Sequence, residues 1–145
     1  MKFTCTIEIE APLQRIVDLF VDTDNFPKWQ GGFQSLEHIS GEVGSAGAKS
    51  RIVYKQGKHI IELIETIIRN DLPNEFSALY EHKHMNNTMT NRFQKLNENR
   101  SILESEIEYT KFHGIIPKLM GILMPGMFKK QTQNWLNNFK LFVER

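Results

Sequence analysis

Residues 128–143 read FKKQTQNWLNNFKLFV, and this stretch decides the fold. Its bulky side chains recur at intervals of four, three, four and three residues, which places them on one face of a helix. A helix with so much aromatic bulk needs a large apolar partner, and the alternating strands upstream are the candidate. The sequence therefore predicts a curved antiparallel sheet that wraps around a C-terminal helix. The residues of this face are Phe128, Thr132, Trp135, Phe139 and Phe142.

Length and composition are those of an ordinary globular chain. The 145 residues fit a single domain, residues 1–145, with 40% hydrophobic and 24% charged residues. A formal net charge of +1 gives no reason to expect a nucleic acid partner. Cys5 is the only cysteine, so an intrachain disulfide is excluded and a buried structural thiol is expected. No secretory signal or uninterrupted membrane span is visible, which predicts a cytoplasmic protein.

The beginning of the chain predicts a strand followed by two short helices. Residues 2–10 alternate between apolar and polar side chains, as in a half-buried strand. Pro12 suits the first turn of a helix, and residues 16–20 supply its apolar face. The turn and cap formers at residues 22–25 end this helix, and a second short helix or turn is expected at residues 26–29.

About six further strands follow, joined by turns. Residues 59–69 are rich in isoleucine, so we expect this strand to be more buried than its neighbours. Asn86 and Asn87 are turn formers, and a turn is expected there. Consecutive hairpins imply an antiparallel sheet with one solvent-exposed face, so the single long helix has to cover the other face. The strands are predicted at residues 33–40, 49–55, 59–69, 76–84, 88–96 and 102–109.

The two ends of the chain resemble a known superfamily. The run IEIEAP at residues 7–12 precedes the first helix, and DTDNFPKW at residues 22–29 follows it. Near the other end, LNNFK at residues 136–140 stands before Glu144 and is similar to the closing Leu-x-x-Leu-Lys…Glu of that superfamily. Phe139 stands there where a leucine is commoner. This order is similar to the SRPBCC superfamily, which contains the START-related lipid-transfer and polyketide cyclase/dehydrase proteins.

The resemblance implies an α+β helix-grip fold. Such a fold has a curved antiparallel sheet of about seven strands around a long C-terminal helix, with two short helices after the first strand. The resemblance also implies a deep cavity between sheet and helix. Members include binders, transporters, cyclases and chaperone activators, so the resemblance indicates a fold rather than one activity.

Three histidines are candidate ligands of a metal ion. An antiparallel pairing centred near Leu72 would bring His59 close to His84, with His82 on the same face. Three imidazoles within reach could bind zinc, but a one-residue change of register sends His59 to the other face. We prefer the interpretation that these histidines form a polar lining at the cavity mouth or are simply exposed to solvent. No metal or other cofactor is expected.

Residues 115–127 form a run that would be apolar on nearly every side of a helix. Pro125 removes a helix hydrogen bond and Gly126 loosens the backbone, so a kink or break is expected here. The run is either the buried first half of the helix or a mobile gate over the cavity. A further alternative is a surface patch that contacts a membrane or a partner protein transiently.

These observations favour a binder or carrier of a small hydrophobic molecule, such as a lipid, a polyketide or an aromatic compound. The alternatives are a polyketide cyclase-type enzyme, with Tyr80, His82 or Tyr109 as general acid or base, and a protein-interaction module like the chaperone activators. No catalytic residue is assigned, because Glu62 and Glu65 point to opposite faces of one strand and no nucleophilic triad stands out. The predicted cavity residues are Trp29, Tyr54, Tyr80, His82, Tyr109, Met124, Phe128, Thr132 and Trp135.

Overall fold

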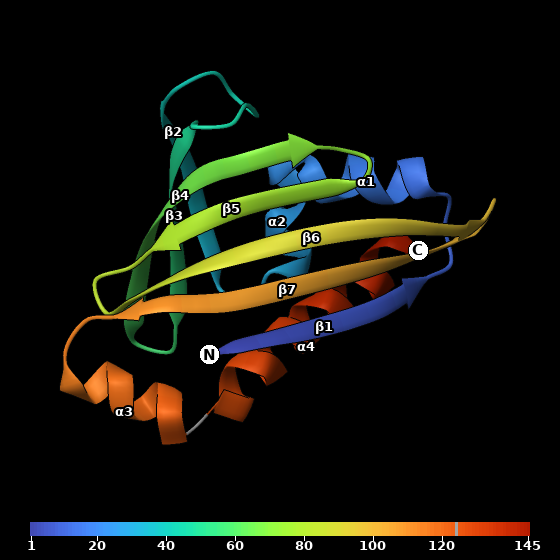
Figure 1. Ribbon diagram of the computed structural model, residues 1–145. Coiled ribbons are helices and arrows are strands. Elements are labelled where there is room, and N and C mark those ends of the chain that lie inside the picture. The colour runs from blue at the N-terminus through green and yellow to red at the C-terminus, as the bar shows by residue number, and fades with distance from the viewer. Residues whose placement is uncertain (124) are drawn as a thin grey trace.

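The computed structural model describes the backbone of residues 1–123 and 125–145, and the side chains outside residues 120–125. Across these residues, a seven-stranded antiparallel sheet curves around a long C-terminal helix (Figure 1), which confirms the predicted helix-grip fold. The strands are β1 (Lys2–Ile9), β2 (Phe33–Ser40), β3 (Lys49–Gln56), β4 (His59–Asp71), β5 (Glu75–Glu81), β6 (Met85–Asn97) and β7 (Arg100–Phe112). The helices are α1 (Leu13–Val21), the 3-10 turn η1 (Thr23–Asn25), α2 (Phe26–Trp29), α3 (Ile115–Leu123) and α4 (Pro125–Val143).

The strand order is β1-β7-β6-β5-β4-β3-β2, so hairpins connect neighbours from β2 to β7 and β1 pairs with β7. In the β1–β7 pair, Cys5 lies opposite Ser105 and Ile7 lies opposite Leu103. Burial along β1 alternates from residue to residue, and the Cys5 thiol is buried, as the sequence predicts. The inward-facing residues of successive strands therefore meet on one continuous concave face.

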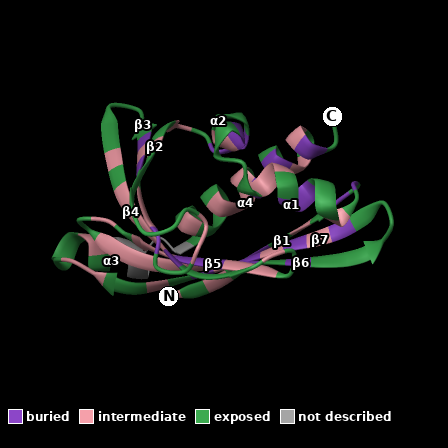
Figure 2. Cartoon of the chain, turned by 90° about the horizontal axis from the view of Figure 1, so that it is seen from above, coloured by how far each residue is buried: buried purple, intermediate pink, exposed green. Residues whose placement is uncertain are grey.

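The C-terminal half of α4 packs into a solid core. Phe139 is 0% exposed, and its ring centroid lies 5.0 Å from that of Trp29 and 5.6 Å from that of Phe20. Leu136 and Val143 are buried in the same cluster, which includes residues of β1, α1 and β7. Figure 2 shows buried residues on the C-terminal part of α4 and on the sheet beside it. The core thus fills one end of the space between helix and sheet.

Strand β4 is less buried than its isoleucines suggest. Ile60 is 61% exposed and Ile68 is 50% exposed, while Ile67 is buried. The expectation that this strand is more buried than its neighbours is therefore wrong. The reason is that Ile60 points to the outer face of the sheet, which no second layer among the described residues covers, and Ile68 is the extra, unpaired residue at the register shift between Ile67 and Arg69.

The turn between β5 and β6 lies at residues 82–84, so the predicted turn at Asn86 and Asn87 is wrong. The backbone N–H of His82 donates to the carbonyl of Met85 at 3.0 Å. Asn86 and Asn87 belong to β6, where both pair with residues of β5 and β7. Cross-strand pairing outweighs the turn preference of asparagine here, and it brings an amide onto the inward face.

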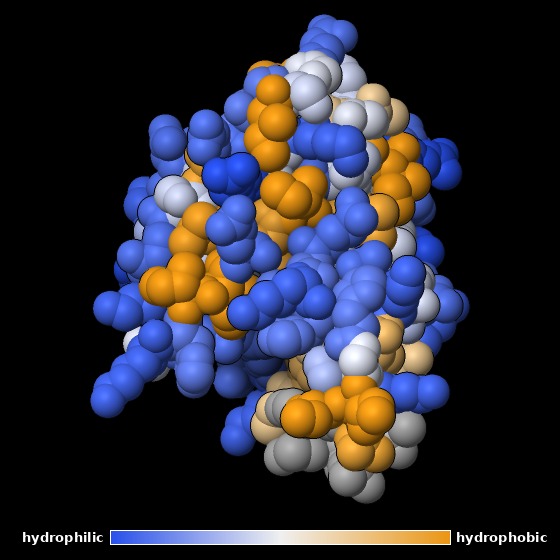
Figure 3. All heavy atoms as spheres, turned by 90° about the vertical axis from the view of Figure 1, so that its left-hand side faces the viewer, coloured by the Kyte–Doolittle hydropathy of each residue, from blue (hydrophilic) through white to orange (hydrophobic). Residues whose placement is uncertain are grey.

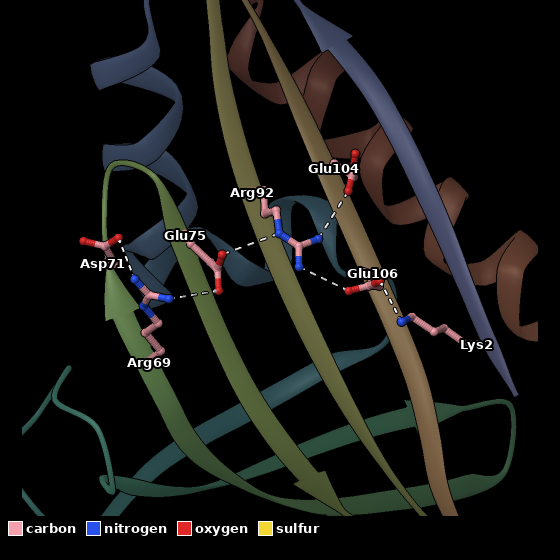
Figure 4. Close-up of polar contacts among 7 residues, drawn as sticks. All are labelled: Lys2, Arg69, Asp71, Glu75, Arg92, Glu104 and Glu106. Carbon is pink, nitrogen blue, oxygen red and sulfur yellow. Dashed lines mark hydrogen bonds and ion pairs between the residues drawn. The ribbon is translucent and has the colours of Figure 1, made fainter.

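The outer face of the sheet is exposed to solvent, as its alternating charged residues predict. Arg92 lies 3.5 Å from Glu75, 3.3 Å from Glu104 and 3.2 Å from Glu106, measured between nitrogen and oxygen (Figure 4). Lys2 joins this network through Glu106 at 3.2 Å. Exposed ion pairs of this kind are individually weak because water screens them. The concave face is therefore the better candidate for a functional site.

Helix α3 lies at the end of the sheet where β7 finishes (Figure 1). Ile115 is 77% exposed and Ile116 is 72% exposed, and Leu119 and Met127 are exposed as well. Figure 3 shows apolar surface gathered at this end of the molecule. Nothing in the described residues covers these side chains, so the predicted contact of this segment with a membrane or a protein stays a prediction.

The C-terminal segment is helical on both sides of residue 124. Helix α3 ends at Leu123 and α4 begins at Pro125, while residue 124 between them lies outside the described residues. The kink or break expected at Pro125 and Gly126 stays a prediction, because it adjoins residue 124, which lies outside the described residues. Among the described residues, no helix combines the length and the apolar character needed to cross a membrane.

Candidate functional site

A cavity of about 1200 Å³ lies between the concave face of the sheet and α4. Trp135 and Phe128 of α4 face strands β2 to β7 across it, and Trp29 of α2 closes one side. Asn134 and Asn138 also line the cavity although they are exposed, so the cavity opens to solvent along this edge of α4. Ligand pockets commonly measure about 300–1,000 Å³, so there is room for a molecule of several rings.

A row of polar side chains crosses the cavity wall, with one residue from each strand from β2 to β7. Strand pairing places each of these residues directly opposite the next, so all six lie on the same face of the sheet. All six line the cavity. We call this set the polar row: His38, Ser50, Glu65, Tyr80, Asn87 and Tyr109.

Apolar side chains border the polar row on both sides. Two residues away along each strand, the inward positions on one side are Ile52, Leu63 and Met85, with His82 among them. On the other side the corresponding positions carry Ala48, Ile67, Met89 and Ile107. The cavity wall therefore consists of a polar band between two apolar bands. Such a wall suits a ligand with an apolar body and a few polar groups.

Glu65 and Tyr80 form the centre of the polar row. The Tyr80 hydroxyl donates a hydrogen bond of 2.9 Å to Oε2 of Glu65. Burial raises the pKa of the Glu65 carboxyl, because the charged form loses its hydration, while the bond from Tyr80 partly opposes this effect. Burial together with the nearby Glu65 raises the pKa of Tyr80 well above its ordinary value. Tyr80 is therefore a hydrogen-bond donor at neutral pH, and Glu65 is an acceptor when it is ionised.

Tyr54 connects the cavity wall to α2. Its hydroxyl donates a hydrogen bond of 2.7 Å to Oε1 of Gln30, and its ring stacks on Trp135 with a centroid distance of 5.4 Å. Burial also raises the pKa of Tyr54. The local satisfaction of this hydroxyl agrees with a structural role, whereas the Trp135 ring beside it offers its remaining surface to the cavity.

Tyr109 of β7 lies at the end of the polar row, near the start of α4. Its ring centroid lies 4.9 Å from that of Phe128 and 5.9 Å from that of Phe112. Burial raises the pKa of Tyr109 to about 12, so its hydroxyl is protonated at neutral pH. This hydroxyl has no hydrogen-bond partner among the described residues, which leaves it available to a ligand.

The structure brings most of the predicted cavity residues together. Thr132 bonds back to its own helix, with its hydroxyl donating to the Phe128 carbonyl at 3.2 Å. Met124 lies outside the described residues. Trp29 is buried, and its Nε1 donor has no partner among the described residues. The predicted residues on the cavity wall are Trp29, Tyr54, Tyr80, His82, Tyr109, Phe128, Thr132 and Trp135.

The three histidines considered as metal ligands do not converge. His59 lies exposed at the β3–β4 hairpin opposite Gln56, because β5 ends before it reaches the level of this residue. His82 instead has His84 beside it, with ring centroids 5.3 Å apart, and His113 nearby. Burial, with these neighbours, lowers the pKa of His82. Within the part of the chain that the structure describes, no three potential ligands are grouped as a metal ion would require.

Sequence reasoning missed Glu65 as a site residue. The inward positions of β4 carry Ile61, Leu63, Glu65 and Ile67, so one acidic side chain interrupts an otherwise apolar row. This interruption of the apolar pattern is the sequence signal that could have identified Glu65 as a site residue. Glu62 faces outward and pairs with Arg51, which agrees with the prediction that the two glutamates cannot pair with each other.

No family model matches the sequence, and a search of curated proteins finds no match. The structure is similar to the ZhuI aromatase/cyclase from a Streptomyces species, with a TM-score of 0.83 and 11% identity over 100% of this chain and 94% of that chain. It is similar to a START superfamily protein from Mycobacterium smegmatis, with a TM-score of 0.75 and 12% identity over 93% of each chain.

A third similar structure is norcoclaurine synthase from Thalictrum flavum in complex with dopamine and hydroxybenzaldehyde. The TM-score is 0.71 and the identity 16%, over 99% of this chain and 86% of that chain. At such identities the likeness shows the fold alone. It agrees with the helix-grip architecture and leaves the activity to be argued from the cavity.

Proposed function

With the helix-grip fold as the premise, we propose that this protein binds a small, mainly apolar molecule in the cavity of about 1200 Å³. The observation that carries the proposal is the polar row between two apolar bands on the cavity wall. Apolar walls contribute binding free energy by removing ligand surface from water, and the polar row fixes the orientation of the ligand.

The proposed contacts divide into an apolar and a polar group. Trp135 and Phe128 offer aromatic surface from α4, and Tyr80 and Tyr109 offer hydroxyl groups from the sheet. The similar proteins support this assignment in kind, since norcoclaurine synthase was solved with two small aromatic molecules and ZhuI is an aromatase/cyclase. The remaining proposed contacts are Trp29, Tyr54, His82 and Thr132.

A pair of variants on β3 tests whether the cavity binds ligands. Ser50 faces the cavity and Arg51 faces the outer surface, so Ser50→Trp fills the cavity while Arg51→Trp places the same side chain outside. The neutral dye Nile red should bind to the wild-type protein and to Arg51→Trp with similar affinity. Its affinity for Ser50→Trp should fall by roughly tenfold or more, since the apolar contacts are blocked. Equal binding to both variants would place the dye elsewhere and contradict the proposal.

Native mass spectrometry of protein purified from its own host would then identify the occupant. We expect a co-purified small molecule that is retained by Arg51→Trp and lost from Ser50→Trp. Protein that carries no adduct and also fails to bind Nile red would contradict the proposed function.

A second candidate function is catalysis of the cyclase type, and the Glu65–Tyr80 pair favours it. A buried carboxyl with a raised pKa, hydrogen-bonded to a phenol, is an arrangement suited to proton transfer. A carrier returns the molecule identified above unchanged after long incubation. An enzyme converts it to a cyclised product at a rate that Tyr80→Phe lowers.

A further inference from the structure

We propose that the molecule bound in the cavity carries a protonated amine, and that Glu65 is its partner. This inference rests on the proposed function, because it names the class of ligand for the same cavity. It is carried by the position of Glu65 in the polar row, by its hydrogen bonds and by the charges around it.

Glu65 occupies the middle of the polar row, with Ser50 opposite on β3 and Tyr80 opposite on β5. Its Oε2 accepts the hydrogen bond from Tyr80, whereas its Oε1 has no hydrogen-bond partner among the described residues. Both residues line the cavity. One carboxylate oxygen is thus held in place by the protein, and the other is left for a donor that the protein does not supply.

Among the described residues, no positively charged side chain on the cavity wall pairs with Glu65. Elsewhere on the same strand, Glu62 pairs with Arg51 at 3.1 Å, but no ion pair to Glu65 exists among the described residues. The other ionisable groups on the wall are Lys130, which is exposed on α4, and His38, which bonds to the Gly41 carbonyl at 2.7 Å, together with His82 and the tyrosines.

Carboxylates shielded from water are normally paired with a cation, because the unpaired charge loses its hydration without compensation. Burial raises the pKa of the Glu65 carboxyl, and only the hydrogen bond from Tyr80 opposes this effect. A ligand ammonium group would supply both the hydrogen-bond donor and the countercharge. A neutral hydroxyl would supply only the donor, and a carboxylate would add a second negative charge.

The surroundings of Glu65 define the rest of the ligand. Apolar side chains lie on both sides of the polar row, so the group that bears the amine has to be apolar. The aromatic faces of Trp135 and Tyr54 also line the cavity and favour a flat ring system, and they tolerate a nearby cation. The ligand class is therefore an aromatic or polycyclic amine.

Three probes with the same ring system separate the possibilities. Pyrenylmethylamine is a cation at neutral pH, pyrenylmethanol is a neutral donor, and pyrenecarboxylate is an anion. We expect the wild-type protein to bind the amine about tenfold more tightly than the alcohol, since a charge-assisted hydrogen bond is roughly twice as strong as a neutral one. The carboxylate should bind most weakly.

Glu65→Gln keeps the shape of the side chain and its ability to accept a bond from Tyr80, but it removes the charge. In this variant the amine should lose its advantage of about tenfold, while the affinity for the alcohol changes little. Glu62→Gln is the matched control, because Glu62 lies on the same strand and faces outward. Tyr80→Phe should retain the preference for the amine, because it leaves the carboxylate in the cavity.

The outcomes separate this inference from the proposed function. Equal binding of the three probes to the wild-type protein, or an amine preference that survives Glu65→Gln, would overturn the inference and leave cavity binding intact. Failure of every probe, and of Nile red, would overturn both. If Glu65→Gln did not fold, the comparison of the three probes on the wild-type protein and on Tyr80→Phe would still decide.

Discussion

The sharpest test of the structure compares two truncations on α4. Phe139→Ala removes a side chain that is 0% exposed and packs against the rings of Trp29 and Phe20. Loss of its burial and the void left behind should together cost about 3–5 kcal/mol of unfolding free energy. Two aromatic contacts, worth about 0.5–1.5 kcal/mol each, are part of that sum.

Trp135→Ala removes a larger side chain one turn earlier on the same helix, yet it should cost less. Trp135 is half-buried and already borders the cavity, so its truncation enlarges an existing space instead of creating one. The main loss is the stacking on Tyr54, and we expect about 1–2 kcal/mol in total.

Urea unfolding of the two variants and of the wild-type protein measures the difference. With a slope of about 2 kcal/mol per molar urea, Phe139→Ala should lower the midpoint by about 2 M and Trp135→Ala by less than about 1 M. Nile red binding should show the opposite order, with the larger loss for Trp135→Ala. Equal shifts of the midpoint, or a larger shift for Trp135→Ala, would refute the division of α4 into a core half and a cavity half.

Three further predictions concern charge, backbone and exchange. The pKa of Glu65 is raised in the folded state, so its favourable contribution is present below its unfolded pKa and is lost as pH rises through the folded value. In urea titrations, ligand-free Glu65→Gln should therefore gain stability relative to wild type as the pH rises above about 4, the ordinary pKa of a glutamate, and a difference that stays constant with pH would contradict this. Gly41 and Gly47 both have positive φ, but a Cβ at Gly41 would lie 2.8 Å from the Ala48 Cα, whereas a Cβ at Gly47 would meet nothing within 4 Å. Alanine should therefore lower the free energy of unfolding more at Gly41 than at Gly47, by about 1 kcal/mol or more, in thermal unfolding. Equal losses at the two positions would refute the close contact. Hydrogen exchange should be faster in residues 115–127 than in residues 135–143 and should slow in residues 115–127 when ligand binds, whereas equal protection of both segments without ligand would contradict a mobile gate.

Much of the fold follows from local periodicity. The aromatic spacing along residues 128–143 predicts the amphipathic helix, and the alternation in β1 and β7 predicts which of their side chains are buried. Such patterns are readable because the side-chain direction repeats every two residues in a strand and every 3.6 in a helix. The motif around residues 22–29 adds the helix-grip resemblance, which the structure confirms.

The failures of prediction lie where residues far apart in sequence decide the outcome. Ile60 is exposed because none of the described residues covers the outer face of the sheet, and Ile68 is exposed because it is the extra residue at a register shift; the isoleucine content of β4 reveals neither. Asn86 and Asn87 lie in a strand because pairing partners are present on both sides. The sequence could not place His59, because the length of β5 determines how far its pairing with β4 extends.

The sequence by itself determined the type and order of the elements and the apolar face of α4, because each depends on a pattern within one segment. Only the tertiary structure decided that six polar residues from six strands form one row, and that Glu65 faces Tyr80 within it. Strand register sets that row, and register depends on hairpin lengths and on irregularities such as the shift between Ile67 and Arg69. The division of α4 into a packed half and a cavity half likewise depends on the local distance between helix and sheet, which no single segment encodes.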